Sequence, residues 1–237
     1  MGGELETIGT AEARSALSWW LEAGVDAAIQ EQPRDWLKPP SPPNPPAAEA
    51  PQPNVVQPDH ESLAELQEWL AASAQLPLAS AAAKRILPHG PQNAAVMLLS
   101  DGPVFEDYAA GQPIGGEAWE LAKRMLAAIG IKPEEAYSAS LSPIYSPGAR
   151  SGPNDREAFA RIARRHIALA GPKRLLLLGE GPCQALLGKP LAQARGHVHK
   201  VEGIRTVATF HPRYLVNKPS NKSWAWKDLL LLMEDDS

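Results

Sequence analysis

Residues able to act as acid, base or hydrogen-bond donor stand at the ends of short apolar runs in this chain. His211 directly follows the run from Ile204 to Phe210, and Pro212 comes next. Asp101 directly follows a similar run that starts at Ala94. Imidazole and carboxylate groups are the usual general acids and bases of proteins, and each can also orient a water molecule. We therefore treat His211 and Asp101 as candidate catalytic residues.

Each of these residues also has a purely structural interpretation. Proline is favoured at the first position of a helix, so His211 also fits the corner between a strand and a helix, which spacing alone favours. Asp101 precedes Gly102 and Pro103, a combination typical of a turn. Ser140 ends a weaker apolar run, but no general base lies near it in sequence, which argues against a nucleophilic role.

A repeating scaffold surrounds these positions. Short apolar runs predict strands at 94–100, 137–141, 174–179 and 204–210. Helical spacing predicts helices at 63–74, 116–129, 155–170 and 221–233, and a short one through Gln184 and Leu187. Strands alternating with helices predict a three-layer α/β/α domain with a four-stranded parallel sheet flanked by helices. Because such sheets bind ligands at the carboxyl ends of their strands, we expect Asp101, Ser140 and His211 to share one edge.

The N-terminal part has a different organisation. Residues 1–38 predict a helical segment that carries Trp19 and Trp20. Residues 39–58 contain nine prolines, which predicts an extended, semi-rigid linker. The α/β domain then occupies residues 59–237. The tryptophan-containing segment is either a packing helix or a site for a protein partner.

The charges of the chain are divided unevenly along its length. The net charge is −4, but residues 1–139 hold 8 Lys/Arg and 19 Asp/Glu, a net of −11. Residues 140–227 hold 15 Lys/Arg and 4 Asp/Glu, a net of +11. Such a basic half is typical of a surface that binds a polyanion. A basic surface that is merely solvated would give the same count, so both interpretations stay open.

The composition excludes several classes of protein. Hydrophobic residues make up 44% of the chain, enough for a core, and the single cysteine, Cys183, excludes disulfide frameworks and multi-cysteine metal sites. His197 and His199 lack a third ligand in the sequence, so we expect no metal. No segment has the roughly 18 apolar residues of a membrane span, and the first residues lack the basic start of a signal peptide. We expect a monomeric, cytoplasmic protein that does not bind membranes.

A longer pattern extends on both sides of the candidate residues. The segment His211-Pro212-Arg213-Tyr214-Leu215 is followed by Lys222, Trp226 and Asp228-Leu229. Upstream, Asp101-Gly102-Pro103 is followed by the glycine-rich segment 111–116. These segments resemble the His-Pro-Ser-Tyr-Leu, Lys…Trp-x-Asp-Leu, Gly-Glu-Ala-Pro-Gly and Gly-Arg-Pro-Phe-Val-Gly motifs of the uracil-DNA glycosylase superfamily. The likeness covers about residues 60–233 and is strongest to bacterial branches that carry an iron–sulfur cluster.

The resemblance implies a role for each matching residue. His211 would hydrogen-bond a carbonyl of a base flipped out of DNA and stabilise the charge that develops as the glycosidic bond breaks, while Asp101 would position the attacking water. The base pocket would comprise Gly102, Pro103, Ile114 and Ser140. DNA would be contacted by Arg150, Arg195, Pro212, Arg213, Tyr214, Leu215, Lys218 and Lys222. Among these, Arg213, Tyr214 and Leu215 would form the wedge that holds the flipped base out of the stack.

The sequence departs from the family at several of these positions. Asp101 stands where the family has a glutamate, and Ser140 where it has the asparagine that reads the base. Ile114 replaces the aromatic residue that stacks on the base, a role that Phe105 or Tyr108 could take over. The cluster cysteines fall at Ser73, Leu76 and Ile144, so we expect no iron–sulfur cluster.

Two functions are therefore open. The first is a DNA glycosylase of base-excision repair that hydrolyses the N-glycosidic bond of a deaminated base, uracil or similar. The second is a catalytically inactive DNA-binding or repair-accessory protein with the same fold. The presence of His211-Pro212 and of Asp101 favours the first, whereas Ser140 and Ile114 favour the second.

Overall fold

The computed structural model describes residues 14–15, 18–19, 60–80, 83–145, 148 and 152–234. Most of the predicted N-terminal helical segment (1–38), and the linker at 39–58, lie outside the described residues; residues 14–15 and 18–19 are helical and exposed. The strands are β1 (Lys84–Arg85), β2 (Val96–Ser100), β3 (Ala136–Ser140), β4 (Ile144–Tyr145), β5 (Arg174–Leu178), β6 (Val198–Val201) and β7 (Ile204–Thr209). The helices are α2 (Leu63–Ala72), α3 (Phe105–Ala110), α4 (Gly116–Ala128), η1 (Pro133–Glu135), α5 (Pro153–Ala170), α6 (Glu180–Leu187), α7 (Leu191–Ala194), α8 (Pro212–Asn217), η2 (Pro219–Asn221) and α9 (Lys222–Met233).

The main sheet has five strands in the order β3-β2-β5-β7-β6, and β1 pairs with β4 in a separate two-stranded sheet. The four predicted strands are β2, β3, β5 and β7, and they pair in parallel. The prediction of a four-stranded sheet missed β6, which pairs antiparallel with β7 at the edge. The two-residue turn between them, Glu202-Gly203, has positive φ at both positions, as tight hairpins require. Since β6 has four residues and two of them are exposed, it lacks the apolar run that reveals the other strands.

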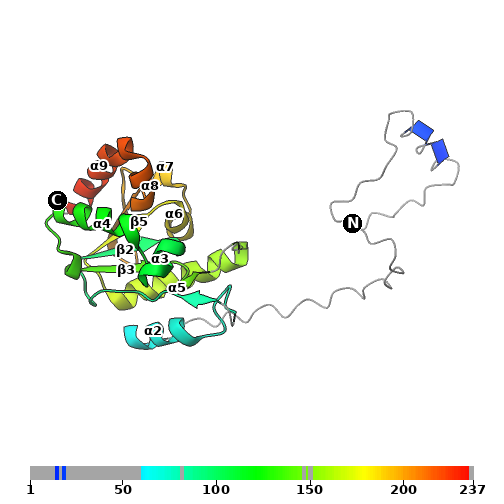
Figure 1. Cartoon of the computed structure of the whole chain (residues 1–237), viewed down its shortest axis with the longest axis horizontal. Helices are drawn as coiled ribbons and strands as arrows, with labels where there is room; N and C mark the ends of the chain where they lie inside the picture. Colours follow the sequence, from blue (N-terminus) through cyan, green and yellow to red (C-terminus); the bar gives the residue numbers. More distant parts are fainter. Residues whose placement is uncertain are drawn as a thin grey trace. The chain divides into compact units, whose positions relative to one another are not determined.

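The sheet is covered by helices on both faces, which confirms the predicted three-layer α/β/α fold (Figure 1). Successive side chains of β5 alternate between two apolar clusters. Leu175 and Leu177 belong to the cluster under α5 and α6, whereas Leu176 and Leu178 belong to the cluster under α4 and α9. This burial on both faces explains why β5 is an uninterrupted run of leucines.

The parallel register places the candidate residues at one edge of the sheet. Ser100, the last residue of β2, pairs with Ser140, the last residue of β3. On the other side, Leu178 of β5 pairs with Thr209 of β7. Asp101 and His211 therefore follow strands that end at the same edge, as the alternation of strands and helices predicts.

Within the ranges that the structure describes, no helix has the length and apolar character needed to cross a bilayer.

A buried polar network links the sheet strand β3 to the helices α5 and α2. His166 on α5 has 2% of its surface exposed, and its Nε2 lies 2.7 Å from the Tyr137 hydroxyl. Gln67 on α2 donates a hydrogen bond to that hydroxyl at 2.9 Å. Burial raises the pKa of Tyr137 to about 12 and lowers the pKa of His166 to about 4. Tyr137 therefore keeps its proton, and its hydroxyl donates a hydrogen bond to the neutral imidazole of His166.

This network predicts a loss of stability in acid. The pKa of His166 is about 4 in the folded protein and about 6.5 in an unfolded chain, so between pH 6.5 and 4 mainly the unfolded state binds this proton. The free energy of unfolding should fall by up to about 1.4 kcal/mol per pH unit between pH 6.5 and 4. Urea unfolding of wild type and His166→Gln across this range measures the difference. Equal pH slopes for both proteins would contradict the assignment.

Candidate active site

His211 lies at the junction between β7 and α8, and its ring is part of the helix start. α8 begins at Pro212, as the sequence predicts, and the backbone N–H of Arg213 donates to Nδ1 of His211 at 3.1 Å. Burial, reinforced by the charge of Arg213, lowers the pKa of His211 to about 3. The imidazole is therefore neutral at physiological pH. Because Nδ1 accepts a hydrogen bond, Nε2 carries the ring proton and is the nitrogen that can donate.

Asp101 lies at the end of β2 and packs against the first turn of α6. A Cβ atom at Gly181 would collide with the carboxyl group of Asp101, so only glycine leaves room for it. Although Asp101 keeps exposed surface, the surrounding protein desolvates its carboxyl group and raises its pKa above 3.8, while the charge of Arg156 opposes this shift. Gly179, two residues before Gly181, lies against His211: a Cβ there would be 3.6 Å from the His211 Cβ. The junction between β5 and the first turn of α6 thus contacts both candidate residues, through Gly181 and Gly179.

The base-pocket positions are placed in different environments. The hydroxyl of Ser140 lies 3.1 Å from that of Ser100, so these neighbouring strand ends share a hydrogen bond. Gly102 and Pro103 follow Asp101 and are half-buried. Ile114 has 1% of its surface exposed and packs in the core under α4. The structure therefore brings Ser140, Gly102 and Pro103 to the edge that carries Asp101, whereas the side chain of Ile114 belongs to the core.

Aromatic side chains gather beside this edge on α3 and β4. The rings of Tyr108 and Tyr145 stack with their centroids 5.0 Å apart and their planes at 7°. Phe105, one turn earlier on α3, is 63% exposed. Phe105 and Tyr108 are the substitutes that we expect for the missing stacking residue, but no pattern in the sequence indicates that Tyr145 joins them. That pairing depends on β4, a strand of two residues that no periodicity reveals.

A buried carboxylate holds the strand that leads to His211. Asp228 on α9 is 2% exposed, and its Oδ2 accepts hydrogen bonds from the Thr209 hydroxyl at 2.7 Å and from Arg195 Nε at 2.8 Å. Arg195 also lies over the Phe210 ring, with its Cζ 3.9 Å from the centroid. The charge of Arg195 is thus neutralised inside the protein. Thr209, the other donor to Asp228, lies two residues before His211 in the sequence. The Asp in the Trp-x-Asp-Leu pattern acts here as an anchor.

A second buried carboxylate, Asp107 on α3, holds the chain after His211. It forms an ion pair of 2.6 Å with the guanidinium of Arg213. Asp107 is not among the residues predicted from the sequence, although an acidic residue three positions after Val104 fits a helix-capping pattern. Its distant partner, Arg213, could not be foreseen, because the two lie 106 residues apart.

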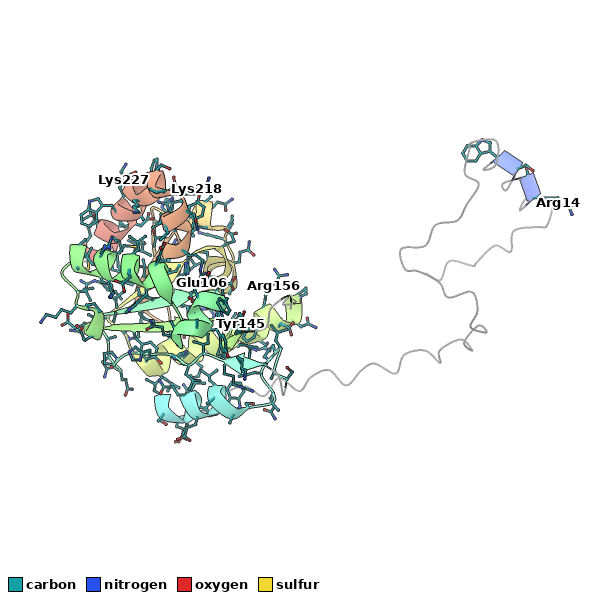
Figure 2. The ribbon with its side chains drawn as sticks, in the orientation of Figure 1. Arg14, Glu106, Tyr145, Arg156, Lys218 and Lys227 are labelled. Carbon is teal, nitrogen blue, oxygen red and sulfur yellow. The ribbon has the colours of Figure 1, made fainter. Side chains whose placement is uncertain are left out.

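The remaining DNA-binding candidates fall into three groups. Pro212 and Leu215 are buried, and Leu215 is 1% exposed. Tyr214 is 43% exposed and stacks on Phe210, so of the predicted wedge residues it presents the most surface. Lys218 and Lys222 are exposed at the start of η2 and α9. Figure 2 shows Lys218 at the part of the domain formed by α8 and α9, together with Lys227 of α9. Arg150 lies outside the described residues.

The positions expected for cluster cysteines do not fit an iron–sulfur cluster. Leu76 and Ile144 are 3% and 4% exposed and pack in one apolar cluster with Leu66, Leu70, Phe159 and Ile162. Ser73 ends α2, and its carbonyl accepts a hydrogen bond from Arg85. No thiolate is available, since Cys183 is buried in the main core. Among the described residues, no group of three His, Cys, Asp or Glu side chains could hold a metal ion either.

Comparison with known proteins agrees with this geometry. The family model of the uracil DNA glycosylase superfamily matches residues 87–231, more than half of the chain. The chain therefore belongs to the uracil-DNA glycosylase superfamily. It is 25% identical over 142 residues to a type-4 uracil-DNA glycosylase of Thermotoga maritima, covering 58% of this chain and 74% of the relative. It is 23% identical over 181 residues to a type-4 uracil-DNA glycosylase of Pyrobaculum aerophilum, covering 71% and 92%.

The Asp228 anchor predicts a large stability effect from a small change. Asp228→Asn should lower the free energy of unfolding by roughly 3 kcal/mol, because removing one partner of a buried ion pair leaves Arg195 without compensation. Glu202→Gln is the matched control: it breaks the exposed ion pair with Arg164, which spans 3.2 Å, and should cost less than about 1 kcal/mol. Chemical denaturation of both variants measures the costs. Equal costs would show that Asp228 does not anchor the strand.

Proposed function

We propose that this protein hydrolyses the N-glycosidic bond of a deaminated base, uracil or similar, after that base has flipped out of DNA. The observation that carries the proposal is the neutral His211, which holds its proton on Nε2 at the strand edge shared with Asp101. Membership of the uracil-DNA glycosylase superfamily supports DNA as the substrate. The relatives named above are uracil-DNA glycosylases, which supports the same class of reaction.

His211 stabilises the leaving group in this mechanism. As the bond between C1′ and the base nitrogen breaks, its electron pair moves onto the base and negative charge collects on a carbonyl oxygen. A neutral imidazole donates a hydrogen bond to that oxygen through Nε2 without giving up its proton, which electrostatic stabilisation of a developing anion requires. The lowered pKa keeps His211 in this form throughout the physiological range.

Asp101 acts on the water that replaces the base. Its carboxylate orients the water toward C1′ and accepts a proton as the new C–O bond forms. The departing base takes up one proton from solvent, and Asp101 returns its own proton to solvent. The products are a sugar hydroxyl and the free base, so the atoms of one water are accounted for. Desolvation raises the pKa of Asp101, which makes its carboxylate a stronger base than an ordinary aspartate.

A second candidate function is a DNA-binding protein without catalytic activity. It is favoured by Ser140, whose single hydroxyl already lies 3.1 Å from Ser100 and cannot make a two-point contact with a base edge. Under this alternative, the site would keep its fold and its contacts to DNA, and no base would be released.

Base release from single-stranded oligonucleotides that contain uracil, hypoxanthine or xanthine tests the proposal directly. We expect wild type to release at least one of these bases, and His211→Ala to do so about 10²- to 10³-fold more slowly, as for loss of one donor to a developing anion. No release by wild type would favour the non-catalytic alternative. Release that survives His211→Ala would overturn the mechanism.

The contact between Gly181 and Asp101 gives a second test. Gly181→Ala introduces a methyl group where the Asp101 carboxyl now lies, so that carboxyl must move. We expect the rate of base release to fall at least about tenfold, because a misplaced catalytic group loses its alignment with the water. The melting temperature should change little, since alanine is tolerated in the first turn of a helix.

The double variant supplies the control for this test. If Gly181→Ala acts through Asp101, adding it to Asp101→Asn should slow the reaction no further. Multiplicative losses in the double variant would mean that Gly181 matters for a separate reason.

A further inference from the structure

Asp107 is the acceptor of three hydrogen bonds that come from three separate parts of the chain. The backbone N–H of Val104 donates to its Oδ2 at 2.9 Å, and that of Gly115 to its Oδ1 at 2.7 Å. Nη2 of Arg213 donates to Oδ2 at 2.6 Å. Because the Asp107 side chain is 1% exposed, these donors replace the water that a free carboxylate would bind.

Two of these donors belong to segments that carry a candidate catalytic residue, and the third belongs to the start of α4. Val104 ends the loop that begins at Asp101, and Gly115 immediately precedes α4. Gly115 also passes so close to α3 that a Cβ atom would collide with the carbonyl of Glu106. Arg213 lies on α8, two residues after His211. One carboxylate therefore joins the Asp101 loop, the start of α4 and the helix that His211 caps.

Arg213 is connected to His211 through both its backbone and its side chain. Its N–H fixes the acceptor role of Nδ1, at 3.1 Å. Its guanidinium group ties the first turn of α8 to Asp107, so the position of that N–H depends on the ion pair. A rotation or shift of α8 would therefore change the orientation of the imidazole.

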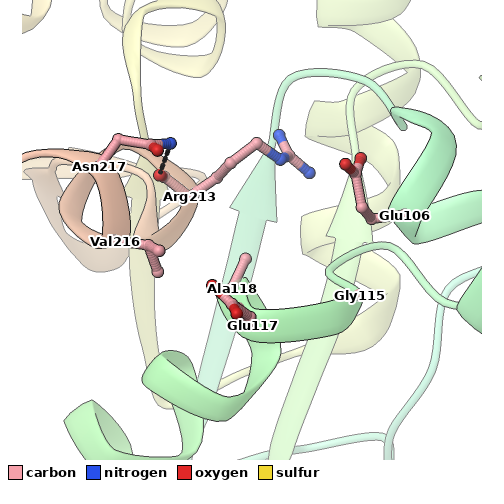
Figure 3. Close-up of a pocket in the computed structure, with 7 residues that line it drawn as sticks. All are labelled: Glu106, Gly115, Glu117, Ala118, Arg213, Val216 and Asn217. Carbon is pink, nitrogen blue, oxygen red and sulfur yellow. Dashed lines mark hydrogen bonds between the residues drawn. The ribbon is translucent and has the colours of Figure 1, made fainter.

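The surroundings of Arg213 do not suit a phosphate contact. Its side chain lines a cavity of about 240 Å³ together with Glu106 and Glu117. Figure 3 shows the side chain reaching from α8 toward α3, where Glu106 lies, with Glu117 on α4. The guanidinium is already paired with Asp107, and two further carboxylates border the same cavity. A DNA phosphate would meet net negative charge there.

The geometry points to Arg213 as a positioning residue, which acts through its ion pair with Asp107 to hold α8 and the donor nitrogen of His211 in place. The family pattern that this segment resembles has serine here, and serine is too short to reach Asp107. The inference rests on the proposed function for its catalytic consequence, but the ion pair and its effect on His211 do not depend on catalysis.

Arg213→Gln separates positioning from DNA contact, because it removes the charge and keeps the backbone N–H. We expect the single-turnover rate at saturating DNA to fall at least about tenfold. The dissociation constant for DNA, and its dependence on salt, should change less than about twofold. A phosphate contact would give the opposite result: weaker binding, a salt slope reduced by about one, and an unchanged rate of bound DNA. That result would overturn the inference.

A measurement on His211 itself makes the test independent of activity. In ¹⁵N NMR titrations of the free protein, we expect Arg213→Gln to raise the pKa of His211 from about 3, since a nearby positive charge is lost and the ring is held less firmly. An unchanged pKa and an unchanged Nδ1 shift would contradict the inference. A changed His211 pKa in a protein that releases no base would support the inference while counting against the proposed function.

Two further variants complete the experiment. Arg161→Gln removes an arginine from an exposed ion pair with Glu157, 2.8 Å long, and should alter neither His211 nor the reaction. Arg213→Lys keeps a cation beside Asp107 and should recover part of the lost rate, which also covers the case in which Arg213→Gln does not fold. If the lysine variant is as slow as the glutamine variant and has the same His211 pKa as that variant, the result would count against the ion pair.

Discussion

The His211 segment is held in place by a buried carboxylate on each side. Before it, Asp228 binds Thr209 and Arg195; after it, Asp107 binds Arg213. A buried carboxylate is stable only when its hydrogen bonds are satisfied, so neither anchor can release its partners without a large cost in free energy. The short chain between Thr209 and Arg213 is thus fixed at both ends. This explains how a histidine at the junction of a strand and a six-residue helix can keep one tautomer and one orientation.

The sequence predicts much of this arrangement, but only the part that depends on local pattern. The apolar runs before Asp101 and His211 locate two strands. Crossover connections keep such strands parallel, so their carboxyl ends lie at one edge of the sheet. Pro212 locates the start of α8. The antiparallel strand β6 escapes prediction because half of its residues face solvent, and the pairing of Asp107 with Arg213 escapes because the two lie 106 residues apart. Ion pairs of that range depend on the fold, and the sequence alone does not contain a signal for them.

The positions expected for cluster cysteines illustrate how packing can take over a structural task. Leu76 and Ile144 occupy two of those positions, and both are buried against side chains of α2 and α5. Burial of each such side chain contributes about 1.5–3 kcal/mol, so a handful of them can hold a loop that thiolate ligands would otherwise hold. Arg85 adds hydrogen bonds to two carbonyls at the end of α2. The fold of the family is therefore compatible with a chain that has one cysteine.

Several arginines of the basic half, residues 140–227, have partners within the protein. Arg195 and Arg213 neutralise buried carboxylates, and Arg174 and Arg205 donate to carbonyls of α9. Arg164 and Arg165 likewise donate to backbone carbonyls. Arginine suits such roles because its planar group presents several donors in fixed directions. The excess of +11 therefore overstates the charge offered to a polyanion.

Within the described residues 211–234, the exposed cations are lysines. Lys218 and Lys222 lie just beyond α8, on the same stretch of chain as the exposed ring of Tyr214. A lysine carries a mobile, hydrated charge that suits a phosphate whose exact position varies along a nucleic acid backbone. Under the proposed function, arginines with fixed geometry hold the His211 segment in place, and the exposed lysines beyond α8 supply contacts to DNA phosphates.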